Sequence, residues 1–249
     1  MYNNVPHFED STEIAEVNKK KLGSTNLAKL ANYWITDKGT EHGCQHNYVR
    51  YYEKHFSHLK NIPTTQLLEI GIARGSSLKC WSEYFNPRAT IYGLDINEKC
   101  LNCCGDNQWK NINLLIGNAT TYNFPNSSLS VSPLFDIIID DGSHLADDIE
   151  KNFHNMIKYL KLDGIYVIED MLTCANADYI ANFYKYEHRS QERETLEEYI
   201  NKNHHNRLIT FIETLKKTSE YQIDMYEDKI CFITRKQKTQ KKVKHSFAF

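Results

Sequence analysis

The chain has 249 residues, of which 41% are hydrophobic and 25% are charged, a composition typical of a globular protein with a substantial core. The formal net charge of -2 gives no electrostatic argument for a nucleic-acid partner, and we expect none. No apolar run approaches the roughly 20 residues that a membrane-spanning helix needs, so no membrane association is expected. The polar start has no signal-peptide core, and the seven cysteines are therefore interpreted as reduced thiols of a cytoplasmic protein.

Three of the cysteines, Cys100, Cys103 and Cys104, lie close together and raise the question of a metal site. A structural zinc site usually adds a second Cys or His pair at a regular spacing, and no such pair follows here. We therefore do not expect zinc at these thiols.

The first part of the chain precedes any strand pattern. Weakly periodic apolar residues within positions 1–30 favour a helical lead-in that serves as an accessory segment or partner contact. A polar loop follows at Thr36 to Gly39. Beyond it, aromatic residues at helical spacing predict a helix with an aromatic face, formed by Tyr48, Tyr51, Tyr52, His55 and Phe56.

The segment 66–75, QLLEIGIARG, is the feature around which the rest of the chain is organised. Its apolar run predicts a strand buried on both faces of a parallel sheet, and the run breaks at Gly71. Gly75 follows, and Ser76 leads into a helical pattern over 76–85. A turn of small residues lets the backbone approach a ligand closely, and Glu69 lies at the carboxyl end of the strand, where open α/β sheets bind ligands.

The spacing of this turn distinguishes among nucleotide-like ligands. A dinucleotide fold is typified by G-x-G-x-x-G, which holds a pyrophosphate. Here the pattern is Glu69-x-Gly71-x-Ala73-x-Gly75, and its acidic residue suits a cofactor that carries an amino group and no phosphate. An ordinary strand-turn-helix without a ligand is the alternative.

Two further strands are predicted at 90–95 and 112–117. Asp95 ends the first of them, 26 positions after Glu69, and an acidic residue there can accept hydrogen bonds from both ribose hydroxyls of a nucleoside. The alternative role of Asp95 is an N-cap for the following segment. Asn118 comes directly after the other strand, followed by Ala119 and a turn-rich loop over 123–133.

Acidic residues end the next two strands as well. The strand 134–141 ends in Asp140 and Asp141 and continues into Gly-Ser-His144, and after a helix predicted over 147–160 the strand 164–170 ends in Glu169 and Asp170. Neighbouring parallel strands bring these ends to one sheet edge, where three carboxylates repel one another unless they are protonated or bind a cation. A hard divalent cation, Mg²⁺ by default, is therefore expected at Asp141, Glu169 and Asp170, the alternative being that some of these acids cap helices.

The last third of the chain is predicted to contain amphipathic helices and a hairpin. Residues 174–207 are polar, aromatic and charged, and they follow the last acidic strand, where substrate lids are common. A helix is expected at 211–215, and strands at 221–225 and 229–234 form an antiparallel hairpin. The tail from Arg235 is basic, and we expect it to be disordered or bound at an interface.

The glycine-rich turn resembles the first motif of class I S-adenosylmethionine-dependent methyltransferases, with Ala73 in place of the middle glycine. The T-D-K-G loop at 36–39, with the H-x-x-x-Y and Y-E-x-x-F patterns after it, resembles the branch that methylates sugar hydroxyls of macrolides, the macrocin and mycinamicin type. The resemblance extends over roughly residues 35–173. It implies a Rossmann-like α/β fold with a seven-stranded, mostly parallel sheet whose last strand is antiparallel, and an N-terminal helical addition.

The resemblance also implies a division of the chain and a set of site residues. The divisions are 1–60 (helical segment and cofactor-covering loop), 61–235 (methyltransferase domain, with a lid-like insertion at 171–207) and 236–249 (basic tail). The residues that it implies for S-adenosylmethionine are Thr36, Lys38, Gly39, Glu69, Gly71, Ala73, Gly75, Ser76, Asp95, Ile96, Asn118, Ala119 and Asp140. An acid after the fourth strand and a pair after the fifth resemble the metal ligands of metal-dependent catechol methyltransferases and of the macrolide-sugar branch. His144 matches the position of the catalytic base in these relatives.

The expected reaction is therefore Mg²⁺-assisted O-methylation of a hydroxyl on a sugar or a glycosylated molecule. The cation on Asp141, Glu169 and Asp170 activates the hydroxyl, and His144 removes its proton. Asp140 either orients His144 or faces the other side of the strand end. The alternatives are a metal-dependent hydroxylase, a nicotinamide-dependent oxidoreductase and a non-catalytic cofactor-binding protein. One histidine beside three acids is a poor match to the usual non-haem iron site, and the glycine spacing disfavours a nicotinamide cofactor. The expected partners are a small-molecule or glycoside substrate and further copies of the chain in a homo-oligomer.

Overall fold

The computed structural model describes residues 27–41, 46–104, 109–124, 134–187 and 194–236. The chain divides into two compact units, Met1–Asn118 and Ala119–Phe249. Most of the predicted helical lead-in, the turn-rich loop over 125–133 and the tail beyond residue 236 lie outside the described residues. Within the described residues, no helix combines the length and the apolar character needed to cross a bilayer.

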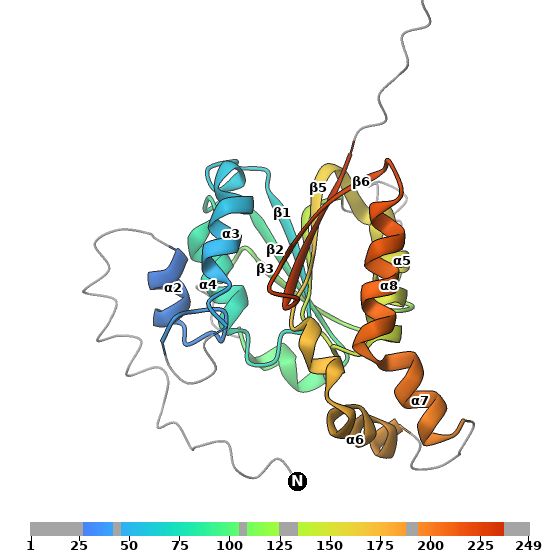
Figure 1. Cartoon of the computed structure of the whole chain (residues 1–249). Helices are drawn as coiled ribbons and strands as arrows, with labels where there is room; N and C mark the ends of the chain where they lie inside the picture. Colours follow the sequence, from blue (N-terminus) through green and yellow to red (C-terminus); the bar gives the residue numbers. More distant parts are fainter. Residues whose placement is uncertain (1–26, 42–45, 105–108, 125–133, 188–193, 237–249) are drawn as a thin grey trace, which may run out of the picture. The chain divides into compact units, whose positions relative to one another are not determined.

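The first unit has a three-stranded parallel sheet. Its strands are β1 (Gln66–Ile70), β2 (Thr90–Asp95) and β3 (Ile112–Ile116), in the order β3-β2-β1. Its helices are α2 (Leu27–Tyr33), α3 (Val49–Phe56) and α4 (Ser76–Tyr84), with short 3₁₀ turns at η1 (Ser57–Leu59) and η2 (Glu98–Asn102) (Figure 1). The strands predicted at 66–70, 90–95 and 112–117 are confirmed.

Three of the five aromatic residues predicted to form a face at 48–56 are buried, and the other two, Tyr51 and His55, are half-buried. Tyr52 and Phe56 are fully buried, and Tyr48 is nearly so. Both Tyr52 and Phe56 contact Trp81 of α4, with ring centroids 5.0 and 6.0 Å apart. Edge-on packing of this kind stabilises a core beyond the burial of area alone, so it fixes the loop before α3 to the helix that follows β1.

The second unit has four strands in the order β4-β5-β7-β6: β4 (Phe135–Asp140), β5 (Leu160–Ile168), β6 (Tyr221–Tyr226) and β7 (Ile230–Arg235). β4 and β5 are parallel, and β7 is antiparallel to both β5 and β6. Its helices are α5 (Ala146–Met156), α6 (Ala177–Glu187), α7 (Leu196–Asn203) and α8 (His205–Lys216), with 3₁₀ turns at η3 (Ile157–Tyr159) and η4 (Met171–Ala175). α5 and α8 run side by side, and α6 and α7 lie at one end of this unit (Figure 1). The terminal hairpin is confirmed.

Two predicted boundaries in this unit are wrong. The helix predicted to reach Leu160 ends at Met156, and β5 begins at Leu160, before Gly164. Leu160 pairs with Phe135 and Ile165 pairs with Ile137, so the intervening residues of β5 form an irregularity in the ladder. Asp163 there has a φ of 63°, and the Asp-Gly pair that resembles a helix stop is a bend inside a strand.

The third difference concerns α8, which starts at His205 and includes the shorter helix expected at 211–215. Its N-terminus is fixed by His204, whose side chain accepts a hydrogen bond from the backbone N–H of Asn206. Histidine is an unusual cap, so the start of this helix carried no recognisable signal in the sequence.

Candidate active site

In the first unit, the glycine-rich turn between β1 and α4 has left-handed backbone at alternate residues. Gly71, Ala73 and Gly75 have φ values of 81°, 42° and 74°. Glycine adopts this region without cost, whereas a Cβ makes it unfavourable. Ala73 therefore keeps the conformation of a glycine turn at the one position where the sequence departs from the glycine pattern, and strain in a non-glycine residue is typical of functional loops.

The carboxylate of Glu69 is fully buried beneath this turn. Its Oε1 lies 3.5 Å from Nζ of Lys38, which is itself only 2% exposed, and its Oε2 accepts a hydrogen bond of 2.8 Å from the hydroxyl of Ser77. A buried carboxylate needs such partners, since an uncompensated charge in the core costs several kcal/mol. The structure thus brings together two residues predicted for the cofactor, Lys38 and Glu69, with α4 supplying a third contact.

The loop before α3 positions Lys38. Thr36 is 6% exposed, and the backbone N–H groups of Tyr48 and Val49 both donate to the carbonyl of Lys38, at 3.0 and 3.2 Å. Gly39 packs so tightly against the side chain of Asn32 that a Cβ there has no room. The polar loop is therefore closely packed onto α2 and α3.

Asp95 lies at the end of β2, as predicted, with both carboxylate oxygens fixed by backbone. Oδ2 accepts from Ile72 N at 2.9 Å and Oδ1 from Asn97 N at 2.8 Å, which links the end of β2 to the glycine-rich turn. The side chain of the next residue, Ile96, is 71% exposed. Asn118, at the end of this unit, is exposed, and Ser76 begins α4.

In the second unit, the strand ends bring Asp141, His144 and Asp170 together. Nε2 of His144 lies 4.0 Å from Oδ1 of Asp141 and 3.9 Å from Oδ2 of Asp170, and all three side chains are about one-sixth exposed. One ligand atom from each lies within 4.8 Å of the others. Carboxylate oxygens at this spacing fit a hard divalent cation such as Mg²⁺, and Nε2 of His144 lies beside them.

Glu169, the third predicted metal ligand, is more deeply placed. Its side chain is 1% exposed, and a carboxylate oxygen lies within 4.8 Å of one from Asp141. Its backbone N–H donates to the carbonyl of Asp140 at 3.0 Å, which continues the pairing of β4 with β5 past the strand ends. Both His144 and Asp170 have left-handed backbone, with φ values of 57° and 52°, so two more of the predicted site residues are strained.

Of the two roles expected for Asp140, its contacts favour the second, in which it faces the other side of the strand end from His144. Its carboxylate is 2% exposed and accepts hydrogen bonds from Nδ2 of Asn152, at 3.1 and 3.3 Å, and from the hydroxyl of Tyr166, at 3.1 Å. Burial raises the pKa of Asp140 to about 7, against the lowering effect of these donors. Successive strand residues point to opposite faces, so Asp140 turns toward α5 while Asp141 does not. Its expected contact with the cofactor stays a prediction.

The segment that carries His144 is held from α6 and α7. The hydroxyl of Tyr179 donates to the carbonyl of Ser143 at 3.0 Å, and the Ser143 hydroxyl donates to Asp148 at 2.6 Å. On the other side of His144, Leu145 is 1% exposed and packs with Ile180 and Tyr199. Both neighbours of His144 in the chain are therefore fixed by the helices of the predicted lid-like insertion.

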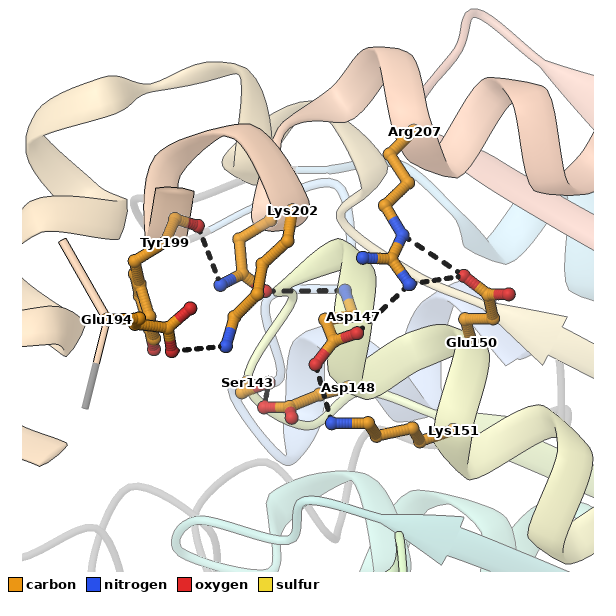
Figure 2. A network of polar contacts seen from close by, with 10 residues as sticks. Ser143, Asp147, Asp148, Glu150, Lys151, Glu194, Tyr199, Lys202 and Arg207 are labelled. Atoms are coloured by element: carbon orange, nitrogen blue, oxygen red, sulfur yellow. Dashed lines mark hydrogen bonds and ion pairs between the residues drawn. The ribbon is translucent and has the colours of Figure 1, made fainter. Parts of the chain in front are cut away.

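Charged and polar contacts join these helices to the start of α5 (Figure 2). The side chain of Asn203 accepts from the backbone N–H of Asp147 at 3.3 Å, and Arg207 bridges Asp147 and Glu150 at 3.0 Å each. Lys202 pairs with Glu194 within the insertion at 2.5 Å. The insertion is thus attached to α5 through several polar contacts, and both Asn203 and Asp147 are buried.

Sequence reasoning missed several residues that support the site. Asn152 lies on the face of α5 that also carries Ile149 and Phe153, so a polar residue at a core position was the available signal. For Tyr179, one aromatic residue among many in 174–207, the sequence offered no signal. Ala119, predicted for the cofactor, is buried, and its carbonyl accepts from the amide of Asn155 at 2.9 Å.

A family model described as a methyltransferase domain matches residues 63–249 of the chain. Among curated proteins, the chain is 31% identical over 155 residues to demethylmacrocin O-methyltransferase of Streptomyces fradiae, an alignment covering 59% of this chain and 37% of that protein. It is 32% identical over 155 residues to mycinamicin VI 2''-O-methyltransferase of Micromonospora griseorubida, covering 59% and 36%. The chain thus spans little more than a third of the length of these relatives.

Among solved structures, the chain is similar to MycE, a methyltransferase of the mycinamycin biosynthetic pathway, in complex with Mg and SAH. The TM-score is 0.63 at 25% sequence identity, over 85% of this chain and 55% of that one. A putative caffeoyl-CoA O-methyltransferase from Staphylococcus aureus shares the fold, with a TM-score of 0.53 at 15% identity over 90% of this chain and 98% of that one. These matches confirm the predicted Rossmann-like fold, a seven-stranded mixed sheet in which β7 is the antiparallel strand.

Proposed function

Because this chain belongs to the methyltransferase domain family, we propose that it transfers the methyl group of S-adenosylmethionine to a hydroxyl of a sugar or glycosylated molecule, with assistance from a divalent cation. The relatives at 31% and 32% identity are named for O-methylation of demethylmacrocin and of mycinamicin VI at its 2'' position, which supports a hydroxyl of a glycosylated acceptor. The observation that carries the proposal is the Asp141–His144–Asp170 cluster. A hydroxyl acceptor must be activated before it can be methylated, and these carboxylates and this imidazole are the groups that can activate it.

We assign cofactor binding to the first unit. Asp95, fixed by two backbone N–H groups, is suited to accept from the ribose hydroxyls, and the exposed Ile96 beside it offers an apolar surface to the adenine. The left-handed turn at 71–75 brings backbone close to the ligand. Lys38 carries a positive charge that Glu69 holds in place, and we assign it to the carboxylate of the methionine moiety.

We assign the cation and the acceptor hydroxyl to the second unit. Asp141 and Asp170 would hold the cation, and a carboxylate oxygen of Glu169 lies within 4.8 Å of one from Asp141. When bound, a divalent cation supplies Lewis acidity that lowers the pKa of a sugar hydroxyl, which ionises far above neutral pH on its own. His144 would accept the hydroxyl proton at Nε2, the nitrogen that faces both carboxylates. S-adenosylmethionine, when bound, would supply the methyl group to this oxygen as its carbon–sulfur bond breaks, and would be left as S-adenosylhomocysteine.

The helices of residues 177–203 serve this reaction as a support for the base. The contacts of Tyr179 with Ser143, and of Ile180 and Tyr199 with Leu145, hold the two neighbours of His144. A general base must lie within hydrogen-bond reach of its proton, so fixing the strained segment around it favours catalysis. A cytoplasmic location and a homo-oligomer, both expected from the sequence, stay predictions.

The test is a methyl-transfer assay with labelled S-adenosylmethionine and a panel of acceptors that includes macrolide glycosides, simple glycosides and sugar nucleotides. We expect methylation of at least one glycoside with Mg²⁺, and its loss with chelator and in Asp141→Asn. A catechol methylated in place of every glycoside would contradict the acceptor class. Methylation that is unchanged by chelator would contradict the role of the cation.

A further inference from the structure

A pair of adjacent thiols lies against the glycine-rich turn of the first unit. A Cβ placed on Gly75 would lie 2.6 Å from Sγ of Cys103 and 3.0 Å from Sγ of Cys104, so both sulfurs fill the space that the glycine leaves open. The two sulfurs are 3.6 Å apart and hydrogen-bonded. Both residues follow η2, the segment after Asp95, and are partly exposed.

The other thiols of the described residues differ from Cys103 in burial and in pKa. Cys80, Cys100, Cys174 and Cys231 are buried, and burial raises the pKa of each. By contrast, the hydrogen bond from Cys104, followed by the positive charge of Lys79, lowers the pKa of Cys103 to about 7, against the opposing effects of burial and of Asp95. The proton stays on Cys104, whose pKa is raised by the same hydrogen bond. Cys103 is therefore the thiol of the described residues with the character of a nucleophile.

An open pocket of about 350 Å³ gives access to this sulfur. Cys103 lines it together with two cationic side chains, Arg74 and Lys99, two amides, Asn97 and Asn102, and the turn residue Ala73. The lining has no acidic residue, so it favours a small anionic molecule. The pocket is also formed in part by the turn that we assign to the cofactor.

We propose that Cys103 is a modification site for small anionic disulfides, and that its modification weakens binding of S-adenosylmethionine by displacing the turn at Gly75. In the reaction, the Cys103 thiolate attacks one sulfur of a disulfide RSSR. The S–S bond of RSSR breaks, a mixed disulfide Cys103–S–S–R forms, and RS⁻ leaves with the electron pair. An excess of a reducing thiol reverses the step. The effect on the cofactor rests on the function proposed above, whereas the reactivity of Cys103 does not.

The expected rate follows from the ionisation of the thiol. At pH 7, a thiol with a pKa of about 7 is half ionised, whereas one with the ordinary value of 9.0 is about 1% ionised. Lower basicity also reduces the intrinsic reactivity of a thiolate, so this roughly fiftyfold gain in thiolate becomes a rate increase of about sixfold over an ordinary cysteine. The pH at which the rate is half-maximal is expected near 7.

The experiment uses the 249-residue chain with Cys44→Ser, so that the remaining thiols are the six compared above. Dithionitrobenzoate, an anionic disulfide whose released thiolate is coloured, reports the rate, and peptide mass mapping identifies the modified cysteine. We expect one fast thiol at Cys103, loss of the fast phase in Cys103→Ser, and an upward shift of the half-maximal pH by at least one unit in Cys104→Ala. The protein modified at Cys103 is expected to bind S-adenosylhomocysteine at least tenfold more weakly, with recovery after reduction.

Several results would overturn the inference. Modification that maps to another cysteine would contradict the assignment of Cys103 as the reactive thiol. A rate at Cys103 no higher than that of a cysteine peptide at pH 7 would contradict it as well. Unchanged affinity for S-adenosylhomocysteine after complete modification of Cys103 would contradict the claim that this modification weakens cofactor binding. If unmodified protein does not bind S-adenosylhomocysteine, the proposed function fails, and fast labelling of Cys103 still supports the modification site. Mass mapping of the Cys44→Ser protein needs no Cys103 variant, so the test does not depend on the folding of that variant.

Discussion

Removing the hydroxyl of Tyr179 tests whether the helices of residues 177–203 support the catalytic base. Tyr179→Phe keeps the ring, which packs against Phe183 with centroids 5.1 Å apart, and deletes the donor to the carbonyl of Ser143 at 3.0 Å. A hydrogen bond of this kind contributes about 1 kcal/mol, and a partly buried acceptor left without its donor costs about 1–3 kcal/mol.

The hydrogen bond from Tyr179 to Ser143 affects catalysis because it restrains the segment that carries His144. Ser143 directly precedes His144, whose left-handed backbone is held by its neighbours. If about 1.4 kcal/mol of this restraint is lost at the transition state, kcat falls about tenfold. We expect kcat to fall by roughly that factor with an unchanged KM for S-adenosylmethionine, measured with the best glycoside of the acceptor panel.

The matched control is Tyr184→Phe, because the Tyr184 hydroxyl donates to the carbonyl of Glu194 at 2.9 Å in the same cluster but away from His144. Both variants are expected to lower the thermal stability by similar amounts. Only Tyr179→Phe is expected to lower kcat. Equal losses of kcat in the two variants, or full activity of Tyr179→Phe, would refute the positioning role and leave the contact as structural.

Three further substitutions test the described packing. Gly75→Ala places a Cβ at a φ of 74° and against the Cys103 sulfur, so we expect denaturant unfolding to show a loss above the roughly 1–2 kcal/mol of backbone strain. Adding Cys103→Ala should recover part of the excess, because the Cys104 sulfur still lies 3.0 Å from the new Cβ. Equal losses in both proteins would exclude a clash with the Cys103 sulfur. Lys38→Met leaves the buried Glu69 carboxylate without its cation and should cost about 3–5 kcal/mol. Adding Glu69→Gln should restore much of that stability, and no restoration would contradict the charge argument. Burial raises the pKa of Cys231 from 9.0 to about 12, so its contribution to stability is complete below pH 9 and is lost as the pH rises toward 12. From pH 8 to 10, the wild type should therefore lose about 1.4 kcal/mol more than Cys231→Ala, and parallel pH curves for the two proteins would contradict this.

Much of the fold could be predicted because its strands are short apolar runs that end in marked residues. Gly71 and Asp95 end β1 and β2 as sharply in the sequence as in the structure, and the acidic ends of β4 and β5 identify the same edge of the second unit. The period of the aromatic residues likewise predicted the buried face of α3. In each case local sequence and tertiary burial favour the same conformation.

The differences arise where a local signal has two structural meanings. Asp163-Gly164 is typical of a helix end, but the register of β5 against β4 places it at a bend inside a strand. Asp140 and Asp141 are equivalent in the sequence, and only the alternation of the strand sends one toward Asn152 and the other toward His144. The contacts of Tyr179 with Ser143 and of Asn203 with Asp147 join residues 36 and 56 positions apart, a separation that no periodicity encodes.

The most direct test of the proposed function is cation binding at the carboxylate cluster. Electron paramagnetic resonance follows free Mn²⁺, a hard cation that prefers the same oxygen ligands as Mg²⁺, during titration of protein saturated with S-adenosylhomocysteine. We predict one bound Mn²⁺ per chain in the wild type, displaced by excess Mg²⁺, and an affinity at least tenfold lower in Asp141→Asn. The absence of a bound ion in the wild type, or an equal affinity in Asp141→Asn, would contradict the assignment of Asp141, His144 and Asp170 as the metal-assisted site of methyl transfer.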